Sequence, residues 1–303
     1  MTLSKVDLNL TKVDLNLTAV KRLIPVRDED AYKNLFGHVL IIAGNHAMGG
    51  AAQLATMATI NSGAGLTTIA TDSANLPAIH TVLPEAMIID WTDVFAVKKM
   101  IEKADILLVG PGFGMDNLDL WKLIKTTITS SKRSLRIILD ADALNLLAAD
   151  LTEDEDKKIH ELLSPDNQHA IILTPHQGEW RRLTAGKVRA DDQESIQNWV
   201  DQAGAILVLK GSSTEIYVPN EPVSYRNPGG NPGMATGGMG DTLAGMIAGL
   251  AGQLNKAADA VKLAVFLHSY IGDQQYEHHY VVLPSQISKQ IPYAMKEISK
   301  KEI

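Results

Sequence analysis

The chain has 303 residues, which is enough to bury a large core in one α/β domain or in two smaller domains. Hydrophobic residues make up 45% and charged residues 21%, and the net charge of −7 argues against a general nucleic-acid or membrane-surface binder, because such proteins need a basic face. The absence of cysteine excludes disulfides, thiolate metal sites and a cysteine nucleophile.

The N-terminal segment carries a tandem duplication, in which the heptad at residues 5–11 is repeated identically at residues 12–18. A seven-residue period is too short for a solenoid repeat, whose period is roughly 20 residues or more. We therefore expect residues 1–30 to form an N-terminal arm without catalytic meaning, and residues 31–303 to form a single domain. The arm is charged and has no apolar signal core, so we expect a cytoplasmic protein with no membrane partner and no nucleic-acid partner.

The body of the chain alternates short aliphatic runs with amphipathic stretches. The runs predict strands over residues 38–42, 66–70, 86–89, 106–109, 135–139, 170–173 and 205–209. The amphipathic stretches predict helices over residues 51–61, 94–101, 118–128 and 193–203. A small antiparallel ribbon is expected at residues 215–218 and 222–225, and helices at 257–273 and 285–299. This alternation is typical of a doubly wound α/β domain with a mostly parallel sheet covered on both faces.

Small, polar and ionisable residues follow five of these strands, at the edge where open parallel sheets bind ligands. They form the segments 43–45, 110–114, 140–142, 174–179 and 210–214. Each segment alone has a structural explanation: Asp140 or Asp142 can cap the next helix, His176 can be a satisfied loop residue, and Glu179 can be a first-turn residue. Their joint placement at successive strand ends favours a functional site.

A Gly-rich loop at residues 227–241 precedes another predicted helix, whose apolar residues recur at helical spacing through residue 254. We therefore expect Gly237, Gly238 and Gly240 just before a helix N-terminus, where free N–H groups and the helix dipole favour an anion such as phosphate. Asp241 has two interpretations. It is either the N-cap of this helix, or a carboxylate that accepts a proton or binds a metal beside the phosphate.

Standard nucleotide and hydrolase motifs do not fit the chain. Gly44 and Gly49 have the P-loop spacing, but Gly50 stands where that loop requires Lys, and Met115 replaces the third glycine of the dinucleotide fingerprint. No His-Glu-x-x-His or Gly-x-Ser-x-Gly motif occurs. Among the chemistries considered, phosphoryl transfer without a covalent enzyme intermediate fits the chain. The Gly-rich loop would hold the charged phosphoryl group, and Asp241 would take a proton from a hydroxyl.

The combined motifs resemble the NAD(P)H-hydrate dehydratase family of the ribokinase-like superfamily. Gly-Gly-Met-Gly-Asp at residues 237–241 is similar to the anion-hole and base motif of the superfamily, and residues 174–179 resemble its Thr-Pro-Asn-x-x-Glu motif with His176 in place of Asn. The vitamin kinases of the superfamily show the Asn form, whereas Pro-His-x-Gly-Glu resembles the dehydratases. The same holds for Gly-Pro-Gly-x-Gly, Asp-Ala-Asp-Ala-Leu-Asn and Lys-Gly-x-x-Thr, so the resemblance spans residues 37–292. The chain also resembles the C-terminal domain of bifunctional nicotinamide-nucleotide repair enzymes.

The resemblance implies a three-layer α/β/α fold and an enzyme that repairs hydrated NADH or NADPH. ADP or ATP, with Mg²⁺, would phosphorylate the ring hydroxyl, and elimination of phosphate would restore the reduced cofactor and leave AMP or ADP. Asp241 would be the base, and the amides of Gly238, Met239 and Gly240 would hold the phosphoryl oxygens. The expected nucleotide contacts are Lys210, Gly211, Ser212, Ser213, Thr214 and Gly240. The expected substrate contacts are Ala43, Gly112 or Gly114, His176 and Asp241, with Asn145 and Asp140 as further candidates and Glu179 as a metal ligand through water.

The resemblance also implies partners. Related proteins are commonly homo-oligomers, tetramers among them, so a homotetramer is expected. Residues 1–36 leave no room for the epimerase domain that is fused to some relatives, so a separate epimerase chain is expected. Two alternatives stay open: a kinase of vitamin alcohols, which would leave a stable phosphorylated product, and a non-catalytic nucleotide-binding protein. The motifs fit ADP and ATP equally, and hydrated NADH and NADPH equally.

Overall fold

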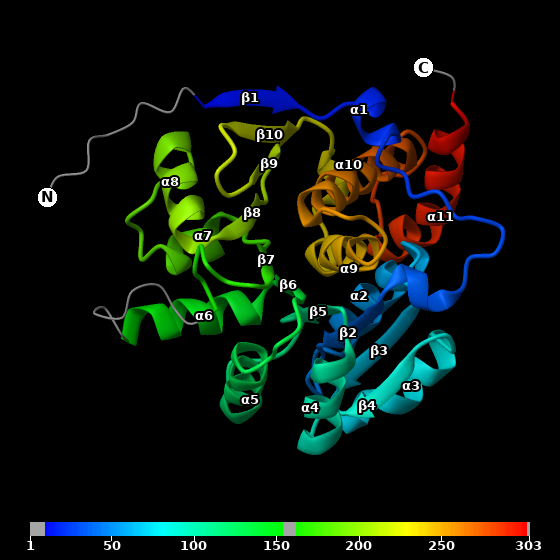
Figure 1. The fold of residues 1–303 in the computed structure, drawn as a ribbon. Coiled ribbons are helices and arrows are strands. Elements are labelled where there is room, and N and C mark those ends of the chain that lie inside the picture. Colours follow the sequence, from blue (N-terminus) through cyan, green and yellow to red (C-terminus); the bar gives the residue numbers. More distant parts are fainter. Residues whose placement is uncertain (1–9, 154–161, 302–303) are drawn as a thin grey trace, which may run out of the picture.

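A ten-stranded sheet runs through the computed structural model, which describes residues 10–153 and 162–301 (Figure 1). The strand order is β1-β10-β9-β8-β7-β6-β5-β2-β3-β4. The strands are Thr11–Asp14 (β1), His38–Ile42 (β2), Leu66–Thr71 (β3), Met87–Asp90 (β4), Ile106–Val109 (β5), Arg136–Leu139 (β6), Ala170–Leu173 (β7), Ala205–Leu209 (β8), Thr214–Tyr217 (β9) and Val223–Asn227 (β10).

The central strands of this sheet are parallel, as predicted. Neighbours from β8 through β5 and β2 to β4 all pair in parallel, whereas β9 is antiparallel to both β8 and β10. Strands β3 and β4 lie on one side of β2, and β5 lies on its other side. This reversal of strand order is a topological switch point, and the crevice outside the carboxyl ends of β2 and β5 is where such sheets bind ligands.

Helices cover both faces of the sheet, so the predicted three-layer α/β/α fold is confirmed (Figure 1). One face carries the helices Leu17–Lys21 (α1), Gly49–Asn61 (α2), Leu76–Val82 (α3), Met239–Ala251 (α9), Ala257–Tyr276 (α10) and Pro284–Lys300 (α11). The other face carries Val94–Lys103 (α4), Leu118–Thr129 (α5), Asp142–Glu153 (α6), Gln177–Leu183 (α7) and Gln193–Ala203 (α8). Short 3₁₀ turns occupy Lys33–Phe36 (η1), Ser73–Asn75 (η2) and Pro232–Met234 (η3). Across the described ranges, no helix is both long and apolar enough to cross a membrane.

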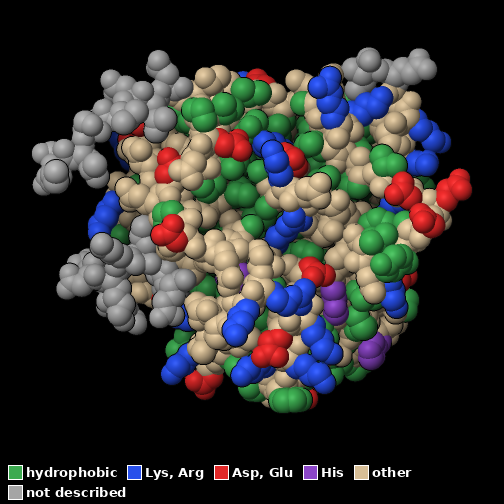
Figure 2. Space-filling model, viewed as in Figure 1, with side chains coloured by type: hydrophobic (Ala, Val, Ile, Leu, Met, Phe, Trp, Pro, Cys, Tyr) green, Lys and Arg blue, Asp and Glu red, His purple; other side chains and the backbone are tan. Residues whose placement is uncertain are grey.

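Alternate residues of each strand enter two separate cores, one on each face of the sheet. In β2, Val39 and Ile41 pack into the core under α2 and α9, while Leu40 and Ile42 pack into the core under α4 and α5. Because both faces are buried, these strands appear in the sequence as continuous apolar runs. On the outside of the molecule, Figure 2 shows acidic, basic and hydrophobic side chains mixed over the viewed face.

Helix α9 lies at the centre of one face and differs from its prediction. The sequence predicts one buried stripe, but every residue from Thr242 to Ala251 is buried. The helix packs against α2, α10 and the strands β5 and β6, so water reaches none of its sides in that range. A Cβ on Gly245 would lie 2.2 Å from the carbonyl oxygen of Ala55 in α2, which shows how closely the two helices approach.

The second copy of the duplicated heptad belongs to the sheet. Its first residues lie in β1, which pairs in parallel with β10 at the sheet edge, and Asn16 caps α1 by accepting a hydrogen bond from the Ala19 amide (2.9 Å). Leu15 is buried in the core under α10 and α11. Residues 1–9, which hold most of the first copy, lie outside the described residues. The domain boundary near residue 30 stays a prediction.

Candidate active site

The loops that follow β2, β5 and β6 are joined to one another at the switch point. The Asn45 amide donates to the carbonyl of Gly112 (2.6 Å), and the Gly114 amide donates to Oδ2 of Asp142 (2.8 Å). Gly112 has a φ of +58°, and a Cβ there would lie 2.6 Å from Cβ of Met48, so the tight approach of these loops requires glycine. The predicted substrate contacts of this group, Ala43, Gly112 and Gly114, therefore share one small region.

Asp140 links the ends of β6, β7 and β8. It is 1% exposed, and its Oδ1 accepts hydrogen bonds from Thr174 Oγ1 (2.8 Å) and from Nζ of Lys210 (2.8 Å). Helix α6 begins at Asp142, whose carboxylate accepts from Gly114 as described above. The hydrogen bonds of both carboxylates thus connect loops at the strand ends.

His176 caps α7. Its Nδ1 accepts hydrogen bonds from the amides of Gly178 (2.9 Å) and Glu179 (3.4 Å), and Oε2 of Glu179 accepts from the His176 amide (2.8 Å). Because Nδ1 is the acceptor, the neutral ring carries its proton on Nε2. Nε2 lies 3.5 Å from Oε1 of Glu179, and the His176 side chain is exposed. His176 therefore has a structural role and also presents an N–H donor at the site.

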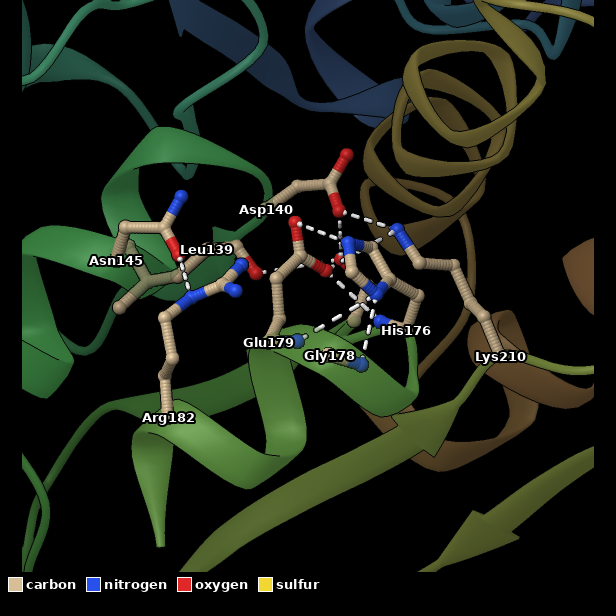
Figure 3. Close-up of polar contacts among 9 residues, drawn as sticks. Leu139, Asp140, Asn145, His176, Gly178, Glu179, Arg182 and Lys210 are labelled. Atoms are coloured by element: carbon tan, nitrogen blue, oxygen red, sulfur yellow. Dashed lines mark hydrogen bonds and ion pairs between the residues drawn. The ribbon is translucent and has the colours of Figure 1, made fainter. Parts of the chain in front are cut away.

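Three carboxylates surround one ammonium group at the base of the site. We call Asp140, Glu179, Asp241 and Lys210 the carboxylate cluster. Nζ of Lys210 lies 2.8 Å from Oδ1 of Asp140 and 4.0 Å from Oε2 of Glu179 (Figure 3). Burial opposes the charge of Lys210, but Asp140 and Glu179 outweigh burial, so the pKa of Lys210 is raised. The cluster holds more negative than positive charge.

Asp241 is the member of the cluster whose pKa is suited to proton transfer. Burial, together with the charge of Asp140, raises its pKa to about 6, although Lys210 acts in the opposite direction. Burial also raises the pKa of Glu179, again against the effect of Lys210. A carboxyl that titrates near neutral pH is a better base than an ordinary Asp and is still ionised at pH 7.

The start of α9 corrects the sequence analysis in two respects. The helix begins at Met239 with Gly238 as its N-cap, and the Thr242 amide donates to the carbonyl of Gly238 (3.0 Å). Gly240 therefore lies in the first turn rather than before the helix. Asp241 is the third helical residue, so the N-cap alternative is wrong. The cause is Gly238, whose φ of +95° starts the helix and whose Cβ would lie 2.4 Å from Cδ1 of Leu54.

The first turn of α9 has the features of the predicted anion site. The amides of Met239, Gly240 and Asp241 precede the first hydrogen bond of the helix, so they have no partner within it. A Cβ on Gly240 would lie 3.2 Å from Nζ of Lys210, so this glycine leaves the space beside the ammonium group open. Free N–H groups, a helix dipole and an ammonium group together attract phosphate.

A cavity of about 430 Å³ opens beside this anion site. It lies between the β8–β9 turn, the Gly-rich loop, the start of α9 and α10. Five predicted nucleotide contacts line it: Lys210, Gly211, Ser212, Thr214 and Gly240. Ser213 instead donates from Oγ to the carbonyl of Asn227 (3.3 Å). The predicted substrate contacts Ala43, Gly112, Gly114 and His176 lie outside the lining, so the predicted nucleotide contacts and the predicted substrate contacts fall in two regions.

Several residues of the site escaped the sequence analysis. Oδ1 of Asn145, a predicted substrate contact, accepts a hydrogen bond from Nε of Arg182 (2.8 Å). Arg182 follows Gly178 by four residues, which places both on one face of a helix, so helical spacing could have identified it. Thr174 lies within the quoted motif but was not a candidate. His268 lines the cavity, and burial lowers its pKa to about 4, so it is neutral; no sequence signal marks it.

Comparisons with known proteins agree with this geometry. The model of a family described as NAD(P)H-hydrate dehydratase matches residues 39–293. An ADP-dependent (S)-NAD(P)H-hydrate dehydratase of Enterococcus faecalis is 37% identical over 281 residues, which cover 93% of this chain and 92% of that protein. The crystal structure of a ribokinase-like superfamily protein from E. faecalis has a TM-score of 0.85 at 34% identity, covering 99% of this chain and 100% of that one. The ADP/ATP-dependent NAD(P)H-hydrate dehydratase of Bacillus subtilis, co-crystallized with ATP and Mg²⁺, has a TM-score of 0.79 at 29% identity, covering 94% and 98%. The chain therefore belongs to the NAD(P)H-hydrate dehydratase family.

Proposed function

We propose that the protein is a nucleotide-dependent (S)-NAD(P)H-hydrate dehydratase, a hydro-lyase that returns hydrated NADH or NADPH to the reduced cofactor at the cost of ADP or ATP. The observation that carries the proposal is the position of Asp241. This buried carboxyl, with a pKa of about 6, lies in the first turn of α9 among free amides and in the field of Lys210. It combines a base with a phosphoryl site.

The first step is phosphoryl transfer to the substrate. The hydroxyl oxygen of the hydrated ring attacks the terminal phosphorus of the nucleotide, and Asp241 accepts the hydroxyl proton. The bond from that phosphorus to the bridging oxygen breaks, which leaves AMP from ADP or ADP from ATP. The amides of Met239 and Gly240, which have no partner within the helix, would stabilise the charge on the transferred phosphoryl oxygens.

The second step is elimination. Phosphate is a far better leaving group than hydroxide, so phosphorylation makes loss of the ring oxygen feasible. The carbon–oxygen bond breaks, the departing phosphate accepts a proton from the neighbouring ring carbon, and the ring double bond of NADH forms again. The His176 side chain is exposed, and its Nε2–H would donate a hydrogen bond to the substrate.

The carboxylates of the site fit Mg²⁺, which takes oxygen ligands and usually binds through one or two carboxylates together with substrate phosphates. In residues 10–153 and 162–301, no group of three or more His, Cys, Asp or Glu side chains is arranged to hold a metal ion. Glu179, with Asp140 beside it, would therefore hold the ion through water, and the nucleotide phosphates would supply further ligands. Bound Mg²⁺ offsets the negative charge of those phosphates.

The proposal extends to the surroundings of the enzyme. We expect a homotetramer in the cytoplasm, and a separate epimerase chain that converts the other epimer of the hydrated cofactor into the S-form. The net charge of −7 fits an enzyme that binds neither nucleic acid nor membrane. Light scattering of the purified protein tests the oligomeric state directly.

The decisive experiment supplies purified protein with S-form hydrated NADH, Mg²⁺ and ADP, and in parallel with ATP. We expect reduced-nicotinamide absorbance to return while phosphate is released. A stable phosphorylated product without NADH would indicate a small-molecule kinase. Nucleotide binding without turnover would indicate a non-catalytic binder. No absorbance with either nucleotide contradicts the proposal.

A further inference from the structure

Arg182 lies at the rim of the site, and in Figure 3 it is on the opposite side of Glu179 from Lys210. Its guanidinium reaches back along α7, where Nη1 lies 3.8 Å from the point that a Cβ of Gly178 would occupy. Its Nε donates to Oδ1 of Asn145 in α6 (2.8 Å). The side chain is exposed, yet this hydrogen bond fixes the direction of its head group.

The charge of Arg182 is not neutralised by this contact, because an amide oxygen carries no net charge. Two other exposed arginines do pair with carboxylates, Arg189 with Asp191 (2.7 Å) and Arg226 with Asp14 (2.7 Å). Among the described residues, no ion pair of Arg182 is found. A guanidinium has five N–H donors in a planar fork, and the bond to Asn145 uses one of them. The rest of the fork is free to bind a phosphate with two parallel hydrogen bonds.

The substrate side of the site needs such a cation. Asp140, Asp142 and Glu179 lie at the strand ends there, and a hydrated dinucleotide carries a diphosphate of the same sign. Lys210 is already shared among the carboxylates and borders the nucleotide cavity. On the other side of Glu179 from Lys210, Arg182 contacts Asn145 and lies over the first turn of α7, which His176 caps.

We propose that Arg182 binds the diphosphate of the hydrated dinucleotide substrate and that Asn145 is a positioning residue for Arg182. The inference rests on the proposed function and adds a substrate-binding residue to it. It also changes the expected role of Asn145, whose oxygen is occupied by Arg182 and acts on the substrate through that guanidinium. The diphosphate of ADP has the same chemistry, so the test separates the two diphosphates.

The kinetic test compares Arg182→Ala and Arg182→Lys with Arg181→Ala. Arg181 is the matched control, because it is the neighbouring exposed arginine of α7 but lines a different surface pocket with Val188 and Arg189. Loss of a charged hydrogen-bonding partner predicts a rise of about 10- to 100-fold in KM for hydrated NADH in Arg182→Ala. KM for ADP and kcat stay within about twofold of wild type, because Arg182 touches neither the nucleotide nor the reacting atoms. Arg182→Lys restores part of the loss, and Arg181→Ala equals wild type.

The binding test titrates NADH, which carries the same diphosphate, at increasing salt concentration. Wild-type binding weakens with salt, and Arg182→Ala shows weaker binding with a flatter salt dependence. Asn145→Ala weakens binding by about threefold, and adds nothing in the Arg182→Ala background if Asn145 acts through Arg182.

Three outcomes overturn the inference. Arg182→Ala equal to Arg181→Ala in both assays means that Arg182 only packs α7 against α6. A rise in KM for ADP instead of hydrated NADH means that the guanidinium serves the nucleotide. Wild-type protein that does not bind NADH has no such subsite. The proposed function is tested by turnover of hydrated NADH by the wild-type protein, whereas the role of Arg182 is tested by the NADH titration, which needs no turnover, so the two failures are distinguishable.

Discussion

Two sets of ion pairs in this molecule have similar shortest contact distances and opposite surroundings. At the sheet edge, Arg226 pairs with Asp14 of β1 at 2.7 Å, and both side chains are more than 40% exposed (42% and 48%). In the carboxylate cluster, Lys210 lies 2.8 Å from Asp140, with exposures of 18% and 1%. Water screens the first pair, so it contributes little to stability, whereas the second pair interacts through a medium that screens charge poorly.

The two sets also differ in charge balance, and this difference explains the chemistry. At the sheet edge Arg226 pairs with one carboxylate, and its hydrogen bond lowers the pKa of Asp14. In the cluster one ammonium group faces three carboxylates, and burial with the charge of Asp140 raises the pKa of Asp241 to about 6. The pKa of an aspartate is therefore lowered at the sheet edge and raised in the cluster. Burial, reinforced by the charge of Asp140, raises the pKa of Asp241, whereas the hydrogen bond from an exposed arginine lowers that of Asp14.

Asp241→Asn is expected to have the largest effect. Loss of a general base lowers kcat by roughly 10²- to 10⁴-fold. The folded-state pKa of Asp241, about 6, lies above the ordinary Asp value, so its stabilising contribution is present below about pH 4 and is lost as pH rises through about 6. The variant should therefore gain about 2 kcal/mol over wild type at pH 8 and nothing at pH 4. Turnover assays and denaturant unfolding at both pH values measure the two effects.

Asp14→Asn is the control for this variant. It replaces the same residue type in an exposed pair, so its activity should equal wild type and its stability should not rise at pH 8. If Asp241→Asn retained the full rate, Asp241 would not be the base. If it lost activity without gaining stability at pH 8, the surplus of buried charge would be absent.

Lys210→Met tests the only cation of the cluster as we define it. Its removal leaves Asp140, Glu179 and Asp241 buried without compensation, which lowers the free energy of unfolding by about 3 kcal/mol at pH 8. Activity should fall by about 10²-fold, because the transferred phosphoryl group also loses a positive charge. The double variant Lys210→Met/Asp140→Asn should recover part of the stability that Lys210→Met loses, but none of the activity. Equal stability of Lys210→Met and wild type would show that the cluster is not strongly coupled.

The pH dependence of kcat/KM in the wild-type enzyme also depends on the charges around Asp241, and its expected change is smaller than the losses of activity above. Since Asp241 must be ionised to accept a proton, kcat/KM should rise about tenfold per pH unit below pH 6 and level off above it. Asp140→Asn removes one of the charges that raise the pKa of Asp241, so the inflection should move to lower pH. A pH–rate profile of both proteins measures the shift. An inflection that stays in place would mean that Asp140 does not act on Asp241 electrostatically.

Much of the fold could be predicted because its signals are local. The strands at residues 38–42, 106–109, 170–173 and 205–209 and the helix at 193–203 have the predicted bounds, since apolar runs end at polar or glycine residues. The edge strand β1 was missed, because it is held by pairing with β10, about two hundred residues away in the chain. The start of α9 was misplaced, because the conformation of Gly238 depends on Leu54 of α2.

The candidate site divides in the same way. Asp140, His176 and Lys210 could be proposed from sequence, because parallel strands bring their carboxyl ends to one edge. Asp241 could be proposed because it follows a Gly-rich loop at the start of a predicted helix. Which atom of His176 carries the proton, and how far the pKa of Asp241 is raised, depend on hydrogen bonds and burial that no spacing contains. The bond between Arg182 and Asn145 joins two helices whose relative placement is a tertiary property.

Arg226→Ala should have the smallest effect of these changes. Strand β1 keeps its backbone bonds, from the Thr11 amide to the carbonyl of Pro222 (3.0 Å) and from the Leu15 amide to that of residue 226 (2.8 Å), and the Leu15 side chain stays buried. Tm and kcat/KM should equal those of wild type, and any small loss of Tm should vanish at high salt. Thermal unfolding at low and high salt measures this. A loss of Tm as large as that of Lys210→Met, unchanged by salt, would mean that exposure is not what separates the two sets of ion pairs.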